Sequence, residues 1–202
     1  FEEWAAVPLV FLTAWHMLKT RAGLRAGETV LIHAAGSGIG SAAVQIAKLS
    51  GAEVVVTAGT AEKLEKAGQL GADYGINYLQ DDFVEKVKEF THGKGVDVVF
   101  EHIGPETFEK SLLCLKRGGR VVTCGATSGP AVNIDLRLFF VKQLSLSGCY
   151  MGSRKELMEV LRLVESGRLR PVVDSVFQLK DAIKAQSRMI ERKQFGKIVL
   201  VP

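Results

Sequence analysis

The chain has 202 residues, of which 47% are hydrophobic and 24% are charged, which is typical of a folded globular protein and excludes a disordered or collagen-like chain. Lysine and arginine number 26 against 22 aspartates and glutamates, for a formal net charge of +4. This balance suits an anionic ligand and does not favour a nucleic-acid binder. Cys114, Cys124 and Cys149 form no Cys-x-x-Cys pair, so neither a disulfide framework nor a zinc ribbon is predicted, and a cytoplasmic location is expected.

No membrane span or secretory leader is predicted. The longest apolar stretch, residues 5–15, contains Pro8 and has about half the length that a bilayer requires, so we expect it in a hydrophobic core. No charged region followed by an apolar core and a cleavage site is recognisable at the start. The chain begins with Phe1 in a helix-like segment, and we interpret it as a piece of a longer protein.

From residue 29 onward, short runs of β-branched residues alternate with amphipathic helical stretches, which predicts βαβ units. A leading helix is predicted over residues 5–21. The predicted strands are residues 29–33, 53–57, 74–77, 96–100, 120–124, 144–150 and 197–201. The predicted helices are residues 38–49, 61–70, 81–90, 105–115, 154–166 and 180–193. Several strands are apolar almost throughout, as parallel strands covered on both faces are.

The ends of the helices carry the expected signals. Thr60 precedes one helix and Gly71 follows it, Pro105 stands at a first helical position, and Gly118 and Gly119 turn a helix back into a strand. No linker, repeat or low-complexity tract divides the chain. We therefore predict one doubly wound α/β domain of the Rossmann type over residues 1–202, with helices on both faces of a parallel sheet and residues 1–28 as a leading helix and linker.

The most informative stretch is TVLIHAAGSGIGSAAVQIAKLSGA, residues 29–52. A hydrophobic strand runs into Gly36, Ser37, Gly38, Ile39 and Gly40, and a helix then begins with small residues. Glycines allow a tight turn, close approach of a ligand and close packing of the helix on the sheet. The helix start offers unpaired N–H groups and roughly half a positive charge to a pyrophosphate. The pattern predicts a dinucleotide site.

The glycine pattern is a relaxed variant of the strict fingerprint. If Gly40 is the third glycine of G-x-G-x-x-G, the first two places hold Ala35 and Ser37. A tight strand-to-helix corner also needs glycine in proteins that bind no nucleotide, so the loop alone leaves this alternative open.

The end of the second strand indicates which dinucleotide is bound. About 20 residues after the loop, where NAD enzymes place an acid for the ribose hydroxyls, the sequence reads Thr57-Ala58-Gly59-Thr60-Ala61-Glu62-Lys63. An acid there would repel a 2′-phosphate, whereas Lys63 offers a cation. NADP(H) is favoured over NAD(H), with an ordinary exposed lysine as the alternative reading of Lys63.

These residues resemble the nucleotide-binding domain of the medium-chain dehydrogenase/reductase superfamily, which includes the zinc-type alcohol dehydrogenases and quinone oxidoreductases. The resemblance covers essentially the whole chain. It rests on the segments AAVPLVFLTAWHML, AGETVLIHAAGSGIGSAAVQIAKLSGA, LGADYGINY, GVDVVFEHIG, LKRGGRVVTCGATSG, LSLSGCYMGS and FGKIVLVP.

The resemblance implies a role for individual positions. Thr13 is expected near the nicotinamide, and the glycine loop, residues 36–40, around the pyrophosphate. The residues expected around the 2′-phosphate are Thr60, Lys63 and Tyr78. His102 and Ile103 would border the adenine or its ribose. The positions expected to present backbone to the nicotinamide amide are Cys124, Gly125, Ala126, Cys149, Tyr150 and Met151. Gly196 and Lys197 would close over the cofactor. As alternatives, Cys124 and Cys149 are small buried hydrophobes and His102 caps a strand end.

Members of this superfamily carry an N-terminal barrel of about 120 residues that supplies most of the substrate pocket. The resemblance therefore implies that residues 1–202 are the C-terminal, cofactor-binding portion of an enzyme of about 320 to 350 residues. On its own, this chain is expected to bind cofactor and scarcely to turn over.

A catalytic zinc is not expected in this chain. The alcohol dehydrogenases of the superfamily bind Zn²⁺ with three protein ligands, and the resemblance places the third of these at Leu9, which cannot ligate a metal. The histidines at positions 16, 33, 92 and 102 do not rebuild a site at the usual spacing. The zinc-independent, quinone-reductase-like branch is favoured.

The resemblance implies NADPH-dependent hydride transfer to or from a carbonyl, enone or quinone, with the cofactor carrying the chemistry. No Ser/His/Asp or paired-carboxylate arrangement is recognisable, so no general acid is named. A non-catalytic nucleotide-binding or redox-sensing domain is the alternative, since fold does not fix function. A methyltransferase that binds S-adenosylmethionine is disfavoured. That ligand also has a ribose diol to hold, and the acid that would hold it is missing after the second strand.

Residues 143–150 resemble the sheet-edge strand through which this superfamily dimerises. A homodimer through this strand is predicted, with an ordinary interior strand as the alternative. The basic segment 188–197 has only Phe195 as a stacking aromatic, so a solvated helix face is favoured over a nucleic-acid patch.

Overall fold

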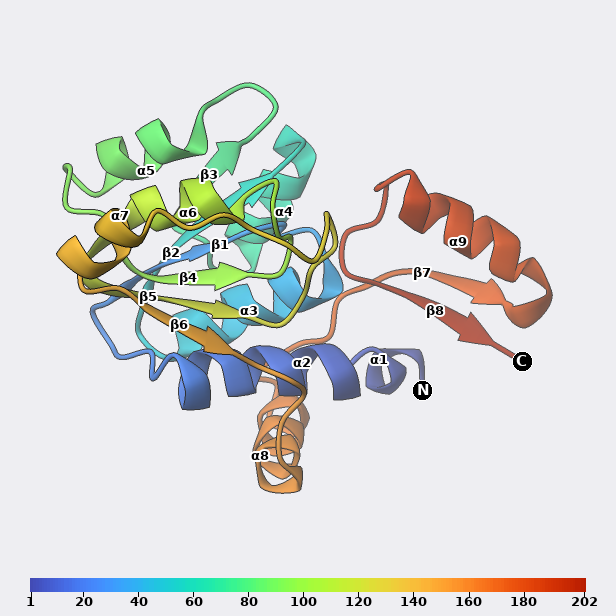
Figure 1. Ribbon diagram of the computed structural model, residues 1–202. Helices are drawn as coiled ribbons and strands as arrows, with labels where there is room; N and C mark the ends of the chain where they lie inside the picture. The colour runs from blue at the N-terminus through green and yellow to red at the C-terminus, as the bar shows by residue number, and fades with distance from the viewer.

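The computed structural model describes all 202 residues and contains a six-stranded, wholly parallel sheet in the order β3-β2-β1-β4-β5-β6 (Figure 1). Its strands are β1 Thr29–Ile32, β2 Glu53–Ala58, β3 Tyr74–Asn77, β4 Val96–Glu101, β5 Leu115–Thr123 and β6 Ser145–Gly148. The strand order reverses between β1 and β4, which is the point where ligands of doubly wound sheets bind, at the carboxyl ends of the strands.

Helices cover both faces of this sheet. They are α1 Glu2–Ala5, α2 Pro8–Trp15, α3 Gly38–Leu49, α4 Ala61–Gln69, α5 Phe83–Phe90, α6 Phe108–Cys114, α7 Leu136–Val141, α8 Arg154–Glu165 and α9 Ala182–Ile190. Along β1, Val30 and Ile32 belong to the core shared with α2, α3 and α8, whereas Leu31 belongs to the core shared with α5 and α6. The predicted doubly wound α/β architecture is therefore confirmed.

The predicted continuous helix over residues 5–21 is wrong in detail. The chain forms α1, breaks at Ala6 and Val7, and resumes as α2 with Pro8 at its first position, where a missing N–H costs nothing. After Trp15 the helix widens into a π-helical turn, η1 (His16–Arg21). Pro105 is also not the first helical residue, because a turn over residues 104–107 delays the start of α6 to Phe108.

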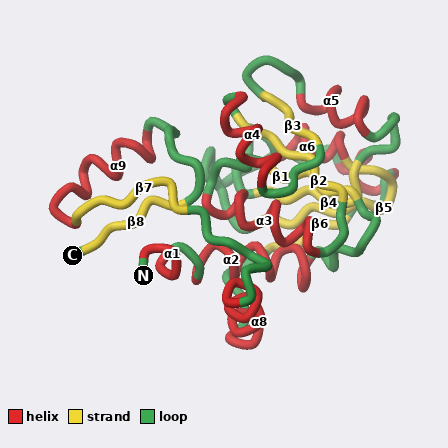
Figure 2. The backbone as a smooth tube through the Cα atoms, turned by 180° about the vertical axis from the view of Figure 1, so that it is seen from behind, coloured by secondary structure: helices red, strands yellow, loops and turns green.

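The last predicted strand does not join the main sheet. β8 (Lys197–Val201) pairs in parallel with β7 (Val173–Gln178), a strand that the sequence analysis did not predict, and the two form a separate sheet. Together with a 3₁₀ turn, Leu179–Asp181, and α9, these strands project from one side of the molecule (Figures 1 and 2). A bridge between Ser37 and Gly196 connects this unit to the glycine loop.

Two predicted strands are shorter at their carboxyl ends than expected. β5 ends at Thr123 and β6 at Gly148, so Cys124 to Ala126 and Cys149 to Met151 lie in the loops that follow. No helix combines the length and apolarity needed to span a membrane.

Candidate functional site

The glycine loop connects β1 to α3 in a tight turn. Ala34 adopts a positive φ of 49°, and Ser37 caps α3 by accepting a hydrogen bond from the Gly40 N–H at 2.9 Å. A Cβ on Gly40 would lie 2.9 Å from the Cα of Ala35 and closer still to the Ala34 carbonyl oxygen. The helix start is thus pressed against the strand end, as the third glycine of a dinucleotide fingerprint requires.

Two lysines lie over the other glycines of the loop. A Cβ on Gly36 would be 2.9 Å from Cδ of Lys63, and a Cβ on Gly38 would be 2.5 Å from Cδ of Lys197. The lysines come from α4 and β8, which are far apart in the sequence. The aliphatic stems of two lysines therefore lie against the loop at the positive end of α3, an end that itself favours an anionic ligand.

A closing segment, residues 192–197, holds the second unit against the loop. The Gly196 N–H donates to the Gly36 carbonyl oxygen at 2.9 Å, and Phe195 is buried beside Gly36. Asp174 on β7 fixes this segment: its carboxylate accepts the Phe195 N–H and two guanidinium N–H groups of Arg188, at 2.9, 2.6 and 2.9 Å.

Burial raises the pKa of Asp174, but its bonds to Arg188, Phe195 and Ser175 outweigh burial and lower it to about 2. The sequence analysis missed Asp174, because nothing in its local sequence signals a role.

The expected 2′-phosphate residues lie around the end of β2. Thr60 caps α4 by accepting the Lys63 N–H, and a Cβ on Gly59 would be 2.9 Å from the hydroxyl of Tyr78. The Lys63 ammonium donates to the Arg192 carbonyl oxygen, and burial lowers its pKa. Glu62, the residue before Lys63, is paired with Lys66 at the surface of α4. The structure brings Thr60, Lys63 and Tyr78 together beside a strand end that carries no acid.

The end of β4 is organised by a buried carboxylate. Glu101 has no solvent exposure and accepts the N–H groups of Ile103 and Gly104 at 2.5 and 3.2 Å and the Thr107 hydroxyl at 2.8 Å. The Nε2–H group of His102 donates to the His33 carbonyl oxygen at 3.1 Å, which fits the alternative role of His102 at the end of the strand. Ile103 lies at the rim of the loop.

A second buried cluster lies beneath this edge. The His33 ring bonds Thr57 at 3.0 Å and Ser111 at 2.9 Å. Burial lowers the pKa of His33 to about 4 and also lowers that of His102. The Ser111–His33 pair resembles a nucleophile and its base, but both residues are buried to at least 99%, so no substrate reaches them. The cluster is structural.

The ends of β5 and β6 lie near α2. The Cys149 N–H donates to the Thr123 carbonyl oxygen at 2.8 Å, and Met151 adopts a positive φ of 55°. A Cβ on Gly152 would be 2.6 Å from Cδ1 of Leu12, the neighbour of the buried Thr13. The residues expected at the nicotinamide end are thus on adjoining segments.

Cys124 and Cys149 are free thiols. Burial raises the pKa of both, that of Cys124 to about 12, and both side chains pack against the core shared with α2 and α3. These contacts fit their alternative reading as small hydrophobes.

The residues present do not fit a catalytic zinc. Leu9, the expected ligand position, is an exposed leucine of α2, and no group of three or more His, Cys, Asp or Glu side chains is arranged to hold a metal. His16 instead bonds Glu156 at 2.8 Å.

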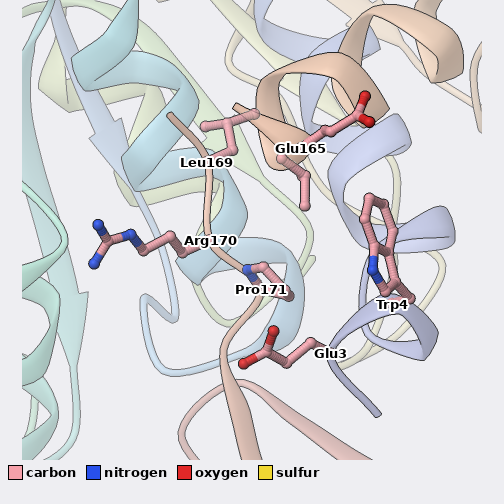
Figure 3. Close-up of a pocket in the computed structure, with 7 residues that line it drawn as sticks. Glu3, Trp4, Glu165, Leu169, Arg170 and Pro171 are labelled. Carbon is pink, nitrogen blue, oxygen red and sulfur yellow. The ribbon is translucent and has the colours of Figure 1, made fainter. Parts of the chain in front are cut away.

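A hollow of about 430 Å³ lies away from these strand ends (Figure 3). It is lined by Glu3, Trp4, Val164, Glu165, Leu169, Arg170 and Pro171. None of these is an expected cofactor residue, and Arg170 points away from the space that Trp4 faces. The hollow does not add to the site.

The model of the zinc-binding dehydrogenase family matches residues 38–166, which is more than half of the chain, and the chain belongs to that family. This confirms the resemblance to the medium-chain dehydrogenase/reductase superfamily. The chain is 37% identical to quinone oxidoreductase 1 of Escherichia coli, over 100% of the chain and 65% of that protein. It is 38% identical to the 2-haloacrylate reductase of a Burkholderia species, over 98% of the chain and 62% of that protein.

Solved structures agree with this assignment. The crystal structure of an NAD-dependent alcohol dehydrogenase superposes with a TM-score of 0.93 at 43% identity, over 100% of the chain and 59% of that one. A 2-octenoyl-CoA carboxylase reductase in complex with NADP and 2-octenoyl-CoA gives a TM-score of 0.89 at 33% identity, over 99% of the chain and 49% of that one. The chain thus spans less than two thirds of the length of these relatives.

Proposed function

We propose that this chain is the cofactor-binding portion of an NADP(H)-dependent oxidoreductase that transfers hydride between the nicotinamide and a carbonyl, enone or quinone. Relatives named as quinone oxidoreductases, a reductase and an alcohol dehydrogenase support the reaction class. They span about one and a half times the length of this chain, so a further lobe that shapes the substrate pocket is part of the proposal.

The observation that carries the cofactor preference is the position of Lys63. Its side chain lies over Gly36, next to the start of α3, and the end of β2 beside it carries no acid. A 2′-phosphate brings up to about two negative charges, which a carboxylate at this place would repel. One relative is named with NAD and another with NADP. The cofactor preference is therefore proposed from the residues of this chain and not from the relatives.

The residues of this chain have binding and orienting roles in the proposed reaction. In the proposed complex, the N–H groups at the start of α3 and Lys197 would hold the pyrophosphate, and Lys63, Thr60 and Tyr78 would hold the adenosine 2′-phosphate. The bound NADPH supplies the hydride. The loops after β5 and β6 would orient the nicotinamide.

The activity is tested on the full-length protein with NADPH and, in turn, a quinone, an enone and an aldehyde. Oxidation of NADPH with one of these acceptors, faster than with NADH at equal concentration, supports the proposal. NADPH binding without turnover of any acceptor would favour the nucleotide-sensing alternative, and absence of binding would reject both.

We also propose that the protein forms a homodimer through β6, in keeping with the expected location of residues 143–150. β6 is an edge strand of the main sheet, and an unpaired edge is suited to pairing with a second copy. Leu146 on β6 is 43% exposed, and Phe140 and Val141 on the preceding α7 are 66% and 58% exposed. Light scattering is expected to give a dimer that Leu146→Asp converts to a monomer; a parent monomer at micromolar concentration would contradict this.

A further inference from the structure

Glu156 on α8 gathers hydrogen bonds from two separate parts of the chain. The residue is 8% exposed, and no lysine or arginine forms an ion pair with it. One carboxylate oxygen, Oε2, accepts the Ser153 N–H at 2.7 Å and the Ser153 hydroxyl at 2.8 Å. The other oxygen, Oε1, accepts Nδ1–H of His16 at 2.8 Å and the Thr20 hydroxyl.

The two oxygens of Glu156 serve different purposes. Oε2 completes a capping box at the start of α8, a local feature that many helices have. Oε1 is not needed for that cap, and it bonds side chains about 140 positions away in the sequence. The second oxygen therefore joins α8 to the π-helical turn η1.

The turn η1 begins three residues after Thr13 and presents His16 and Thr20 to the same carboxylate oxygen. In η1 the Ala22 N–H donates to the Met17 carbonyl oxygen, five residues back, at 2.7 Å. Turns of this kind inside helices are frequent at functional sites. The side chain of Arg21, at the end of η1, donates to the Gly148 carbonyl oxygen at 2.9 Å.

These contacts hold both ends of the loop between β6 and α8, residues 149–152. Arg21 holds Gly148 before the loop, and Glu156 holds Ser153 after it. Within the loop, Met151 has a positive φ, a strained conformation for a residue with a side chain, which persists only where the surroundings impose it. The conformation of the loop therefore depends on the contacts of Arg21 and Glu156 at its two ends.

We propose that Glu156 is a positioning residue for the nicotinamide half of the cofactor. Through Oε1 it fixes the loop 149–152 against the helix that carries Thr13, so that the loop backbone meets the nicotinamide amide in one geometry. This inference rests on the proposed function. The residues that face the pyrophosphate and the 2′-phosphate have no hydrogen bond to Glu156, so the adenosine half of the cofactor is expected to bind independently of it.

The test compares two ligands on the full-length protein by calorimetry: NADPH and 2′-phospho-ADP-ribose, which lacks only the nicotinamide. In Glu156→Gln the side-chain amide cannot accept all four hydrogen bonds. The dissociation constant for NADPH is expected to rise roughly tenfold, as for a lost bond to a charged group, and that for 2′-phospho-ADP-ribose to stay within about twofold. Glu159→Gln, on the same helix with no recorded hydrogen bond, is the control and should change neither.

A milder pair of variants keeps the test informative if Glu156→Gln unfolds. Thr20→Val removes the hydroxyl at similar volume, and Thr20→Ser keeps a hydroxyl. Thr20→Val is expected to lower the affinity for NADPH but not that for 2′-phospho-ADP-ribose, and to reduce the change in nicotinamide fluorescence on binding. Thr20→Ser should restore both the affinity and the fluorescence change. Equal weakening of both ligands, or no effect on NADPH in Glu156→Gln and Thr20→Val, would overturn the inference. A parent protein that binds neither ligand would instead reject the proposed function itself.

Discussion

A Cβ placed on Gly40 would lie 2.9 Å from the Cα of Ala35, so the first turn of α3 and the end of β1 are in contact through their backbones. Gly40→Ala must push them apart. We expect the free energy of unfolding to fall by about 1–3 kcal/mol, as for other overpacked sites, and NADPH affinity to fall with it, because the start of α3 moves. Urea denaturation and calorimetry measure the two effects.

Gly68→Ala is the matched control. Gly68 lies within α4, is exposed, and has no atom within 4 Å of where its Cβ would be. Alanine is favoured over glycine inside a helix by about 0.5–1 kcal/mol, so this variant should be slightly more stable. A Gly40→Ala protein as stable as the parent would contradict the close packing of strand and helix.

Lys63→Ser is expected to weaken NADPH selectively. The variant removes the one cation that lies beside both Thr60 and Gly36, and loss of a charge-assisted contact to phosphate should raise the NADPH dissociation constant roughly tenfold. NADH lacks the 2′-phosphate and should bind about as before. As a control, Lys94→Ser removes an exposed lysine before β4, at the amino ends of the strands, and should change the affinity for neither cofactor. Equal losses of NADPH and NADH affinity in Lys63→Ser would count against a 2′-phosphate contact.

His33 should make stability depend on pH between about 6.5 and 4. Burial lowers the pKa of His33 to about 4 from 6.5, so in this interval the unfolded chain binds a proton that the folded protein excludes. The free energy of unfolding is therefore at its full value, as far as His33 is concerned, above pH 6.5 and decreases as the pH falls toward 4. Urea unfolding across this range should give a steeper fall for the parent than for His33→Gln. Identical slopes would mean that His33 titrates normally in the folded protein.

Asp174→Asn is expected to loosen the closing segment. Asp174 holds Arg188 and the Phe195 N–H, and losing hydrogen bonds to a charged group lowers the free energy of unfolding by about 1–3 kcal/mol. The low end is expected here, because Arg188 lies at the surface. The pKa of Asp174 is lowered to about 2 from 3.8, so its contribution is present above pH 3.8 and lost as the pH falls toward 2. NADPH affinity should also decrease, because the closing segment bonds Gly36.

Asp181→Asn serves as the control for Asp174→Asn, since the bond of Asp181 to Lys184 lies at the surface, where an ion pair contributes at most about 1 kcal/mol. If Asp174→Asn changed stability and NADPH binding no more than Asp181→Asn does, the closing segment would not depend on Asp174.

The main sheet could be predicted because each of its strands is a short run with a local pattern, most of them apolar on both faces. β7 escaped prediction because its sequence, VDSVFQ, is neither strictly alternating nor continuously apolar. α7 escaped because it has only six residues, none of them buried. The pairing of β8 with β7, apart from the main sheet, is a long-range choice that no local pattern records.

The site divides in the same way. The glycine loop and Lys63 follow from spacing along the sequence, since strand, turn and helix are contiguous there. Glu156 and Asp174 could not be found in this way, because each acts through partners that only the fold brings close; His16 and Glu156 are 140 positions apart. The break before Pro8 and the π-helical turn after Trp15 likewise interrupt a segment whose apolar pattern predicts one helix.

The most direct measurement is a calorimetric titration of the full-length protein with NADPH and with NADH under the same conditions. Tighter binding of NADPH is expected, because Lys63 offers a cation next to the end of β2, which carries no acid to repel a 2′-phosphate. Tighter or equal binding of NADH, or binding of neither, would contradict the account.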